Sequence, residues 1–204
     1  MKEKTCRVCR CKFMPSQPMA TVCGPACAIS LAVSKRGKAE KIAKVKERRE
    51  TKAKLEKLKT RADWLKEAKT AAQRFRRLEE LANGSGCMTC KRTQEQVQGS
   101  DGWKPGGAWD GGHFLSKGAR PELALEPMNI WLQCKSCNGG SSKYARKGHT
   151  VSTSFRINLI ERIGLEAVEA LEADNQPRKW TVEELIAIKT SYAAKARELK
   201  RMAA

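Results

Sequence analysis

The chain has 204 residues, of which 41 are lysine or arginine and 22 are aspartate or glutamate, so its formal net charge is +19 at pH 7. Apolar residues make up 40% of the sequence and aromatic residues 5%, which permits one or two small domains and excludes a large globular core. The positive charge favours a polyanionic partner, with nucleic acid ahead of an anionic membrane surface.

No stretch of the sequence has the pattern of a signal peptide or a membrane span. The start, MKEKTCRVC, lacks an apolar segment, and the longest apolar stretch, ACAISLAV, is too short to cross a bilayer. We therefore expect a soluble, cytoplasmic protein that has no membrane partner. In that reducing compartment, the nine cysteines are expected to bind metal rather than to form disulfides.

Residues 1–34 are predicted to form a zinc knuckle. Cys6, Cys9, Cys23 and Cys27 supply four thiolates, which is the ligand number of a structural tetrahedral zinc site. Cys11 is surplus, and is either a free thiol or a replacement for Cys9. A segment this short has almost no core, so the metal is expected to supply most of its folding free energy.

Residues 35–61 are predicted to form a long, solvated, basic helix. The segment is rich in strong helix formers, and lysine and arginine greatly outnumber glutamate in it. Its composition fits a charged spacer and a phosphate-contacting arm equally well. A sustained coiled coil is disfavoured, because Arg49 and Lys52 would fall in the apolar seam that Ile42 and Val45 begin.

Residues 62–150 are predicted to be a helix followed by a metal-braced module. Apolar residues recur every three or four positions from Leu65 to Ala82, which gives one face that should pack on the module, and the helix should stop at the NGSG turn that follows. Residues 99–107, GSDGWKPGG, are expected to be a polar, turn-rich loop.

The central module carries a second set of four thiolates. Cys87 and Cys90 form one Cys-x-x-Cys pair, and Cys134 and Cys137 form the other. Two such knuckles can converge on a single metal while the chain between them varies in length. The sequence therefore predicts two structural zinc ions, one in each four-cysteine set.

Polar residues between and after the cysteines of the second set indicate that this metal-binding module has a chemical role as well as a structural one. Asp110 and His113 lie in WDGGHF, Asn129 lies in EPMNI, and Asn138 directly follows the last cysteine. On a strand, Asp110 would face one side and His113 the other. The second histidine, His149, is either solvated or an added metal ligand.

Residues 151–204 are predicted to be helical. Two short helices should be broken near Gly164, and Pro177 should separate them from a last helix. That last helix is expected to begin at a capping box made by Thr181 and Glu184.

Together, these motifs resemble the HNH, or ββα-metal, nuclease motif on a treble-clef zinc frame, and more closely the phage lambda NinG (Rap) family of recombination endonucleases. The likeness covers nearly the whole chain: the four-cysteine segment, the basic helix, CMTC, WDGGHF, EPMNI with QCKSCN, and the tail NLIERIGLEAVEALE followed by RKWTVEELIAIKTSYAAKARELK. It implies an α+β, mostly helical fold with an N-terminal zinc knuckle and a central zinc-stabilised ββα-metal module. It also implies that the protein is located in the cytoplasm of a bacterial host cell.

The resemblance implies a metal-dependent endodeoxyribonuclease that acts on branched DNA such as Holliday junctions and D-loops. His113 would be the general base, since an imidazole with a pKa of about 6.5 can take a proton from water near neutral pH. Asn138 would begin the helix after the second knuckle and bind Mg²⁺ or Mn²⁺, with Asp110 as the available carboxylate. Asn129 would orient the imidazole or the hairpin, or else be an ordinary turn residue.

The sequence departs from the family motif at three places. Gly112, rather than an acid or a histidine, precedes His113, and Trp131 replaces the histidine of the usual NIH. Gly139 and Gly140 weaken the helix expected after the last cysteine.

Two other functions fit the same residues. One is a zinc-containing DNA-binding protein without catalysis, and the other is an HNH endonuclease directed by sequence. The spread of basic residues along 35–61 suits phosphate contact more than base discrimination, which favours selection by DNA shape. Paired cuts across a junction would indicate a homodimer.

Overall fold

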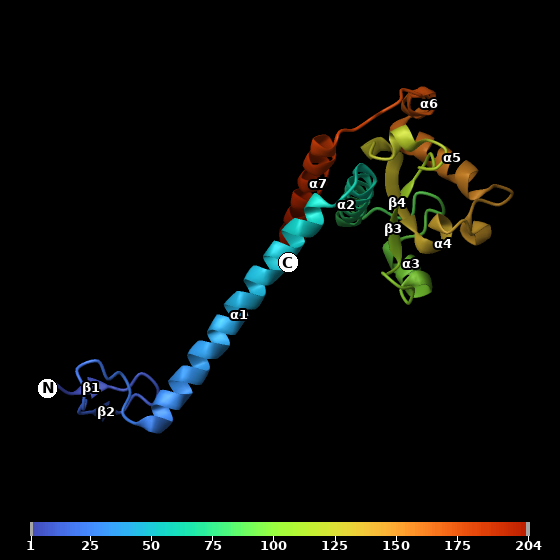
Figure 1. Cartoon of the computed structure of the whole chain (residues 1–204). Coiled ribbons are helices and arrows are strands. Elements are labelled where there is room, and N and C mark those ends of the chain that lie inside the picture. Colours follow the sequence, from blue (N-terminus) through green and yellow to red (C-terminus); the bar gives the residue numbers. More distant parts are fainter. Residues whose placement is uncertain (1, 203–204) are drawn as a thin grey trace. The chain divides into compact units, whose positions relative to one another are not determined.

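The computed structural model describes residues 2–202, and the chain divides into two compact units, Met1–Lys59 and Thr60–Ala204. The boundary falls between helix α1 (Pro25–Lys57) and helix α2 (Arg61–Ala82). Figure 1 shows the elements of each unit. None of the described helices is long and apolar enough to cross a membrane.

The first unit is a small two-stranded ribbon followed by α1. Strand β1 (Lys4–Thr5) pairs antiparallel with β2 (Lys12–Phe13). Helix α1 begins at Pro25, earlier than the predicted boundary at residue 35. Proline is favoured at the first helical position, because its fixed φ suits a helix and the N–H that it lacks would have no partner within the helix. The predicted basic helix is thus continuous with the knuckle, and none of its residues is buried.

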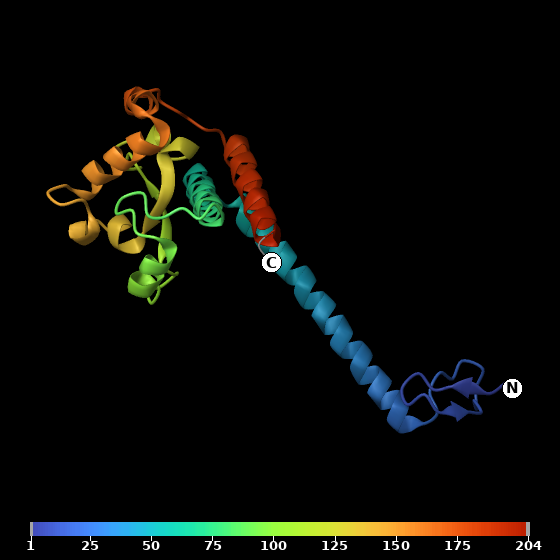
Figure 2. The same ribbon diagram turned by 180° about the vertical axis from the view of Figure 1, so that it is seen from behind.

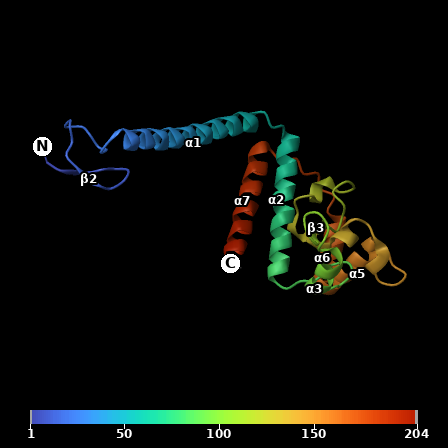
Figure 3. The same cartoon turned by 90° about the horizontal axis from the view of Figure 1, so that it is seen from below.

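In the second unit, α2 lies between the C-terminal helix α7 (Val182–Met202) and a β-hairpin (Figure 3). Ala68 and Ala72 are buried on the predicted apolar face of α2, but so are Trp64 and Glu80. The carboxylate of Glu80 tolerates burial because the guanidinium of Arg162 lies 2.8 Å from it.

The hairpin consists of β3 (Trp109–His113) and β4 (Ile130–Cys134), with His113 opposite Ile130 and Asp110 opposite Gln133. It is flanked by α2 on one side and by α5 (Val151–Ile163) on the other (Figures 1 and 2). The chain between the strands includes two 3₁₀ turns, η1 (Pro121–Leu123) and η2 (Pro127–Asn129).

Helix α3 (Gln94–Asp101) occupies part of the segment that was predicted to be a loop over 99–107. The helix forms because Thr93 and Gln96 make a capping box at its start. At its end, the buried carboxylate of Asp101 accepts hydrogen bonds from the backbone N–H of Ser136 at 3.0 Å and from its hydroxyl at 2.9 Å. Only the residues after Asp101 remain irregular.

Helix α4 (Lys135–Asn138) follows β4 directly. Asn138 therefore ends this helix rather than beginning it. The helix starts earlier than predicted because the sulfur of Cys134 takes the N-cap position and accepts from the N–H of Cys137. A 3₁₀ turn, η3 (Ser142–Tyr144), leads on to α5.

The C-terminal helices are confirmed. Gly164, at φ +89°, separates α5 from α6 (Leu165–Ala173), a backbone conformation that favours glycine. Thr181 and Glu184 form the expected capping box before α7, with hydrogen bonds of 2.7 and 3.2 Å. Three apolar clusters make up the core of the unit: one includes Leu132 and Val97, the second Ile130 and Leu185, and the third Trp131 and Leu159.

Candidate functional site

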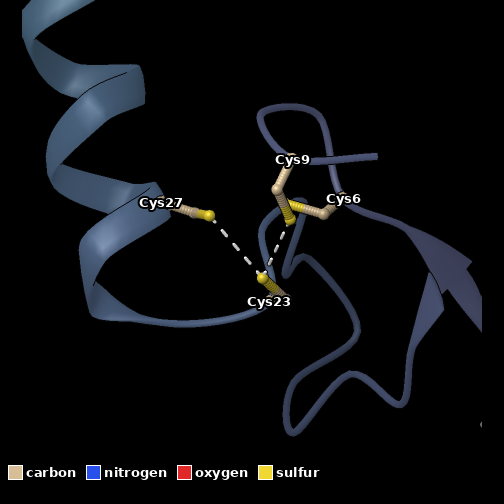
Figure 4. Close-up of side chains that lie close together, drawn as sticks. All are labelled: Cys6, Cys9, Cys23 and Cys27. Atoms are coloured by element: carbon tan, nitrogen blue, oxygen red, sulfur yellow. Dashed lines mark hydrogen bonds between the residues drawn. The ribbon is translucent and has the colours of Figure 1, made fainter. Parts of the chain in front are cut away.

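The four cysteines of the first unit converge on one point (Figure 4). The sulfur of Cys23 lies 3.5 Å from that of Cys9 and 3.6 Å from that of Cys27, and all four sulfurs lie within 4.8 Å of one another. Tetrahedral zinc with Zn–S bonds of about 2.3 Å places its sulfurs about 3.8 Å apart. The donor set and its spacing therefore fit zinc. Cys27 comes from the first turn of α1, so the metal would tie the ribbon to the helix.

Cys11 stands outside this set. Its thiol is exposed and lies 3.8 Å from the carbonyl oxygen of Cys9, whereas the sulfur of Cys9 points into the cluster. Of the two alternatives for Cys11, the structure supports the free thiol.

The second set joins the hairpin to the chain on either side of it. The sulfurs of Cys90 and Cys134 are 4.0 Å apart, and those of Cys87 and Cys137 complete a group within 4.8 Å. All but Cys90 are at most 1% exposed. The N–H of Cys134 donates to the sulfur of Cys87 at 3.3 Å, as expected of thiolates that bind a metal. This set also fits a structural zinc, held at the junction of β4 and α4.

Arg92 contacts this second set, a role that sequence reasoning did not find. Its guanidinium donates to the sulfur of Cys90 at 3.3 Å and to that of Cys134 at 3.2 Å, and it stacks on the ring of Tyr144 at 3.5 Å. Four thiolates around one Zn²⁺ carry a net charge of −2, which this cation would partly neutralise. Its place two residues after a Cys-x-x-Cys pair was the available signal.

His113, the last residue of β3, lines a cavity of about 630 Å³. Asn138, His149 and Lys117 line the same cavity. The Nε2 atom of His113 lies 3.1 Å from the carbonyl oxygen of Ala124. A carbonyl only accepts, so Nε2 carries the proton in the neutral ring and Nδ1 keeps its lone pair.

The environment of His113 favours the neutral imidazole. Burial lowers its pKa below the usual value, and the hydrogen bond to Ala124 opposes this change in pKa. The positive charges of Lys117 and Lys69 lower the pKa further. At neutral pH, the ring is therefore an uncharged proton acceptor.

Asp110 and Asn138 are brought together beside a second, smaller cavity of about 350 Å³. The side-chain amide of Asn138 donates to Oδ2 of Asp110 at 3.0 Å, and Nζ of Lys135 lies 3.9 Å from Oδ1. Asn138 and Gln73 line both cavities, so this pair and His113 occupy adjoining spaces. A carboxylate and a carboxamide offer the hard oxygen ligands that Mg²⁺ accepts, with its remaining positions left to water and phosphate.

Asn129 does not contact the imidazole. Its side chain is fully buried, accepts from the N–H of Leu115 at 2.7 Å and donates to the carbonyls of Leu115 and Leu123 at 3.0 and 3.1 Å. Of the roles predicted for it, the structure supports orientation of the hairpin. Asn129 is linked to His113 only indirectly: it binds the carbonyl of Leu123, and the next residue, Ala124, has the carbonyl that accepts from Nε2 of His113.

Trp131, at the position of a histidine in the usual motif, has a structural role. The guanidinium groups of Arg76 and Arg162 lie 5.0 and 4.8 Å from the centre of its ring. His149 is exposed and lines the cavity of His113, so the structure leaves both of its predicted roles open.

Comparison with known proteins places this arrangement in a family. A family model described as "Bacteriophage Lambda NinG protein" matches residues 1–202. The chain belongs to the NinG family. It is 34% identical to protein ninG of Salmonella phage P22 and 34% identical to protein ninG of Escherichia phage lambda, in each case over 94% of this chain and 90% of the relative. It is 33% identical to protein ninG of Escherichia phage 933W, over 97% and 94%. No solved structure matches the chain.

Proposed function

We propose that this NinG-family protein is a metal-dependent endonuclease that hydrolyses phosphodiesters in branched DNA. The observation that supports it best is the pair of adjoining cavities. One holds His113 with a free Nδ1 lone pair, and the other holds Asp110 in contact with Asn138. All three residues lie on the hairpin and helix that the second four-cysteine set braces.

Hydrolysis requires a water to lose a proton as its oxygen bonds to phosphorus and the P–O bond to the leaving strand breaks. Nδ1 of His113 would take that proton. Asp110 and Asn138 would hold Mg²⁺ or Mn²⁺, which when bound neutralises charge on the phosphoryl and leaving oxygens. Asn129 would keep the segment that contacts the imidazole in place.

Selection by DNA shape is the second part of the proposal. The formal charge of +19 supports phosphate contact, and helix α1 exposes its basic residues along its whole length. Branched DNA presents converging phosphate tracks and deformable crossover strands, so a protein that reads the backbone can prefer it to linear duplex. Symmetric cuts would require a homodimer with two facing sites.

The test is cleavage of an immobile four-way junction, a D-loop and linear duplexes with the same arms, with Mg²⁺ or Mn²⁺. Wild type should cut branched substrates preferentially, and His113→Ala should lower the cleavage rate by roughly a hundredfold or more, the range for loss of a general base. Junction affinity should stay near wild type.

Ser142→Ala is the matched control, because Ser142 lines the same cavity without a proposed role. A wild type that leaves every substrate intact would favour the binding protein without catalysis. Equal cutting of junction and duplex, or dependence on arm sequence, would favour an endonuclease directed by sequence. Normal cutting by His113→Ala would remove the histidine from the mechanism.

A further inference from the structure

Between Lys66 and Arg77, one face of α2 borders both cavities and carries only basic and neutral polar side chains. At 100° per residue, its members span about 140° of the helix circumference. Glu67, at the edge of this face, is paired with Lys189 at 2.7 Å. We call this surface the α2 basic face, and it consists of Lys66, Lys69, Thr70, Gln73, Arg74 and Arg77.

The α2 basic face is fixed against the hairpin. Gln73 donates to the carbonyl of Gly111 at 3.0 Å, and Arg77 donates to the carbonyl of Trp109 at 3.1 Å. Thr70 and Arg74 line the cavity of Asp110 together with Gln73 and Arg77. These two hydrogen bonds tie the face to β3, the strand that carries Asp110 and His113.

In the described part of the chain, three cations beside the site lack an anionic partner, unlike Lys135, which pairs with Asp110. Among residues 2–202, no carboxylate forms an ion pair with Lys69, Arg74 or Lys117. Burial lowers the pKa of Lys69, and the charge of Lys117 lowers it again, so these two ammonium groups lie within range of each other's field. Gathering like charges is unfavourable in the free protein, and a polyanion would relieve it.

The spacing of the face suits a nucleic-acid backbone. Positions i and i+4 are about 6 Å apart along a helix axis, and phosphates follow one another about every 3.4 Å along the axis of a strand. Lys66, Thr70 and Arg74 thus cover a length of about 12 Å, which corresponds to three or four phosphates. The face also lacks the exposed apolar side chains that a protein partner would bury.

We propose that the α2 basic face, together with Lys117, binds the phosphates of one DNA strand and leads that strand between the two cavities. The basic helix α1 is then a second contact and not the one that places DNA at the site. The orientation of the strand toward His113 rests on the proposed function, but the binding itself requires no cleavage.

The test compares two triple variants in the His113→Ala background, which keeps the substrate intact. The first removes three charges at the site: Lys69→Gln, Arg74→Gln and Lys117→Gln. The matched control removes three exposed charges that line neither cavity: Lys179→Gln, Arg197→Gln and Lys200→Gln. Affinity for a fluorescent junction is measured across a salt series.

The first triple should bind at least tenfold more weakly, and the slope of log K against log salt should become shallower by about 2 to 3, since each duplex phosphate contact contributes about 0.9. The control should change affinity less than twofold if DNA lies where we propose. Poly-glutamate at equal charge should compete poorly, and competition as strong as that of DNA would overturn a nucleic-acid ligand.

Unchanged affinity and slope in a folded site triple would overturn the proposal, even if wild type cleaves DNA. Conversely, a wild type that never cuts, but loses binding in the site triple, would overturn the proposed function and leave this inference standing. Circular dichroism and zinc content establish that the triple is folded. If the triple variant is not folded, the single variant Arg74→Glu decides the question, because the exposed side chain of Arg74 has no partner in residues 2–202. Reversing the charge at this position should weaken DNA binding severalfold.

Discussion

At the scale of single residues, a partly buried hydrogen bond sets the protonation of His113, the residue that we propose as general base. The carbonyl of Ala124 fixes which nitrogen carries the proton, and burial together with two lysines favours the neutral ring. The imidazole is therefore held in the tautomer and charge state that the proposed general-base role requires.

This leads to a prediction about pH. Because the pKa of His113 is lowered, the ring stays neutral below its ordinary pKa of about 6.5, and the acid limb of kcat/KM should have its midpoint below that value. Lys117→Gln removes a positive charge that lowers this pKa, so the midpoint should move to higher pH. Cleavage of a junction at saturating metal between pH 5 and 8 measures both.

Lys179→Gln is the control for this profile, because Lys179 is exposed and lines neither cavity. A midpoint above 6.5 in wild type, or the same midpoint in Lys117→Gln and wild type, would contradict the electrostatic account of His113. The level of activity does not enter the comparison, since only the position of the limb is read.

Sequence reasoning identified residues whose spacing carries the signal and missed those that meet only in the fold. The eight cysteines predicted as ligands form the two sets seen in the structure. Arg92 was missed, because its stacking on Tyr144 and its contact with Cys134 join segments far apart in the chain. The same is true of Lys69 and Lys117, which come from a helix and a loop.

At the scale of elements, helix ends were predictable where a side chain caps the helix, as Thr181 does before α7. They were not predictable where the stabilising contact is distant. Helix α3 continues through Gly99 because Asp101 is held by Ser136, and α4 starts early because a cysteine sulfur caps it. Composition alone favours a loop in the first case.

The contact between α2 and the hairpin gives a prediction at this scale. A Cβ on Gly111 would lie 2.6 Å from the backbone oxygen of Gln73, so Gly111→Ala must push α2 away from β3. We expect a loss of about 1 to 3 kcal/mol in the free energy of unfolding, the usual cost of overpacking. Urea denaturation of the zinc-loaded protein measures it.

Gly99→Ala is the matched control, because Gly99 lies in α3 with no atom within 4 Å of an added Cβ. It should leave stability unchanged or raise it by up to about 1 kcal/mol. Equal effects at the two positions would show that α2 does not press on the hairpin as described.

At the scale of the whole molecule, the two units differ in what holds them together. In residues 2–59, only Cys6 and Pro15 are buried, so the ribbon has no apolar core to stabilise it. The second unit has three apolar clusters, and only one of them includes its metal-binding cysteines. The first unit should therefore depend on its metal for folding, and the second only in part.

The last prediction follows from this difference. The purified, reduced chain should contain two Zn²⁺, and a chelator should remove them in two phases. The first zinc should leave quickly, because Cys9 and Cys23 are exposed, and its loss should unfold the ribbon. The second should leave slowly, because three of its four cysteines are at most 1% exposed, and most of the helical circular dichroism should remain. Elemental analysis measures the amount of zinc, and a colorimetric chelator measures the rates of its release.

The double variant Cys9→Ser with Cys23→Ser should abolish only the fast phase, whereas Cys11→Ser, outside the cluster, should leave both phases intact. One zinc per chain, or a single phase of release, would contradict two independent sites.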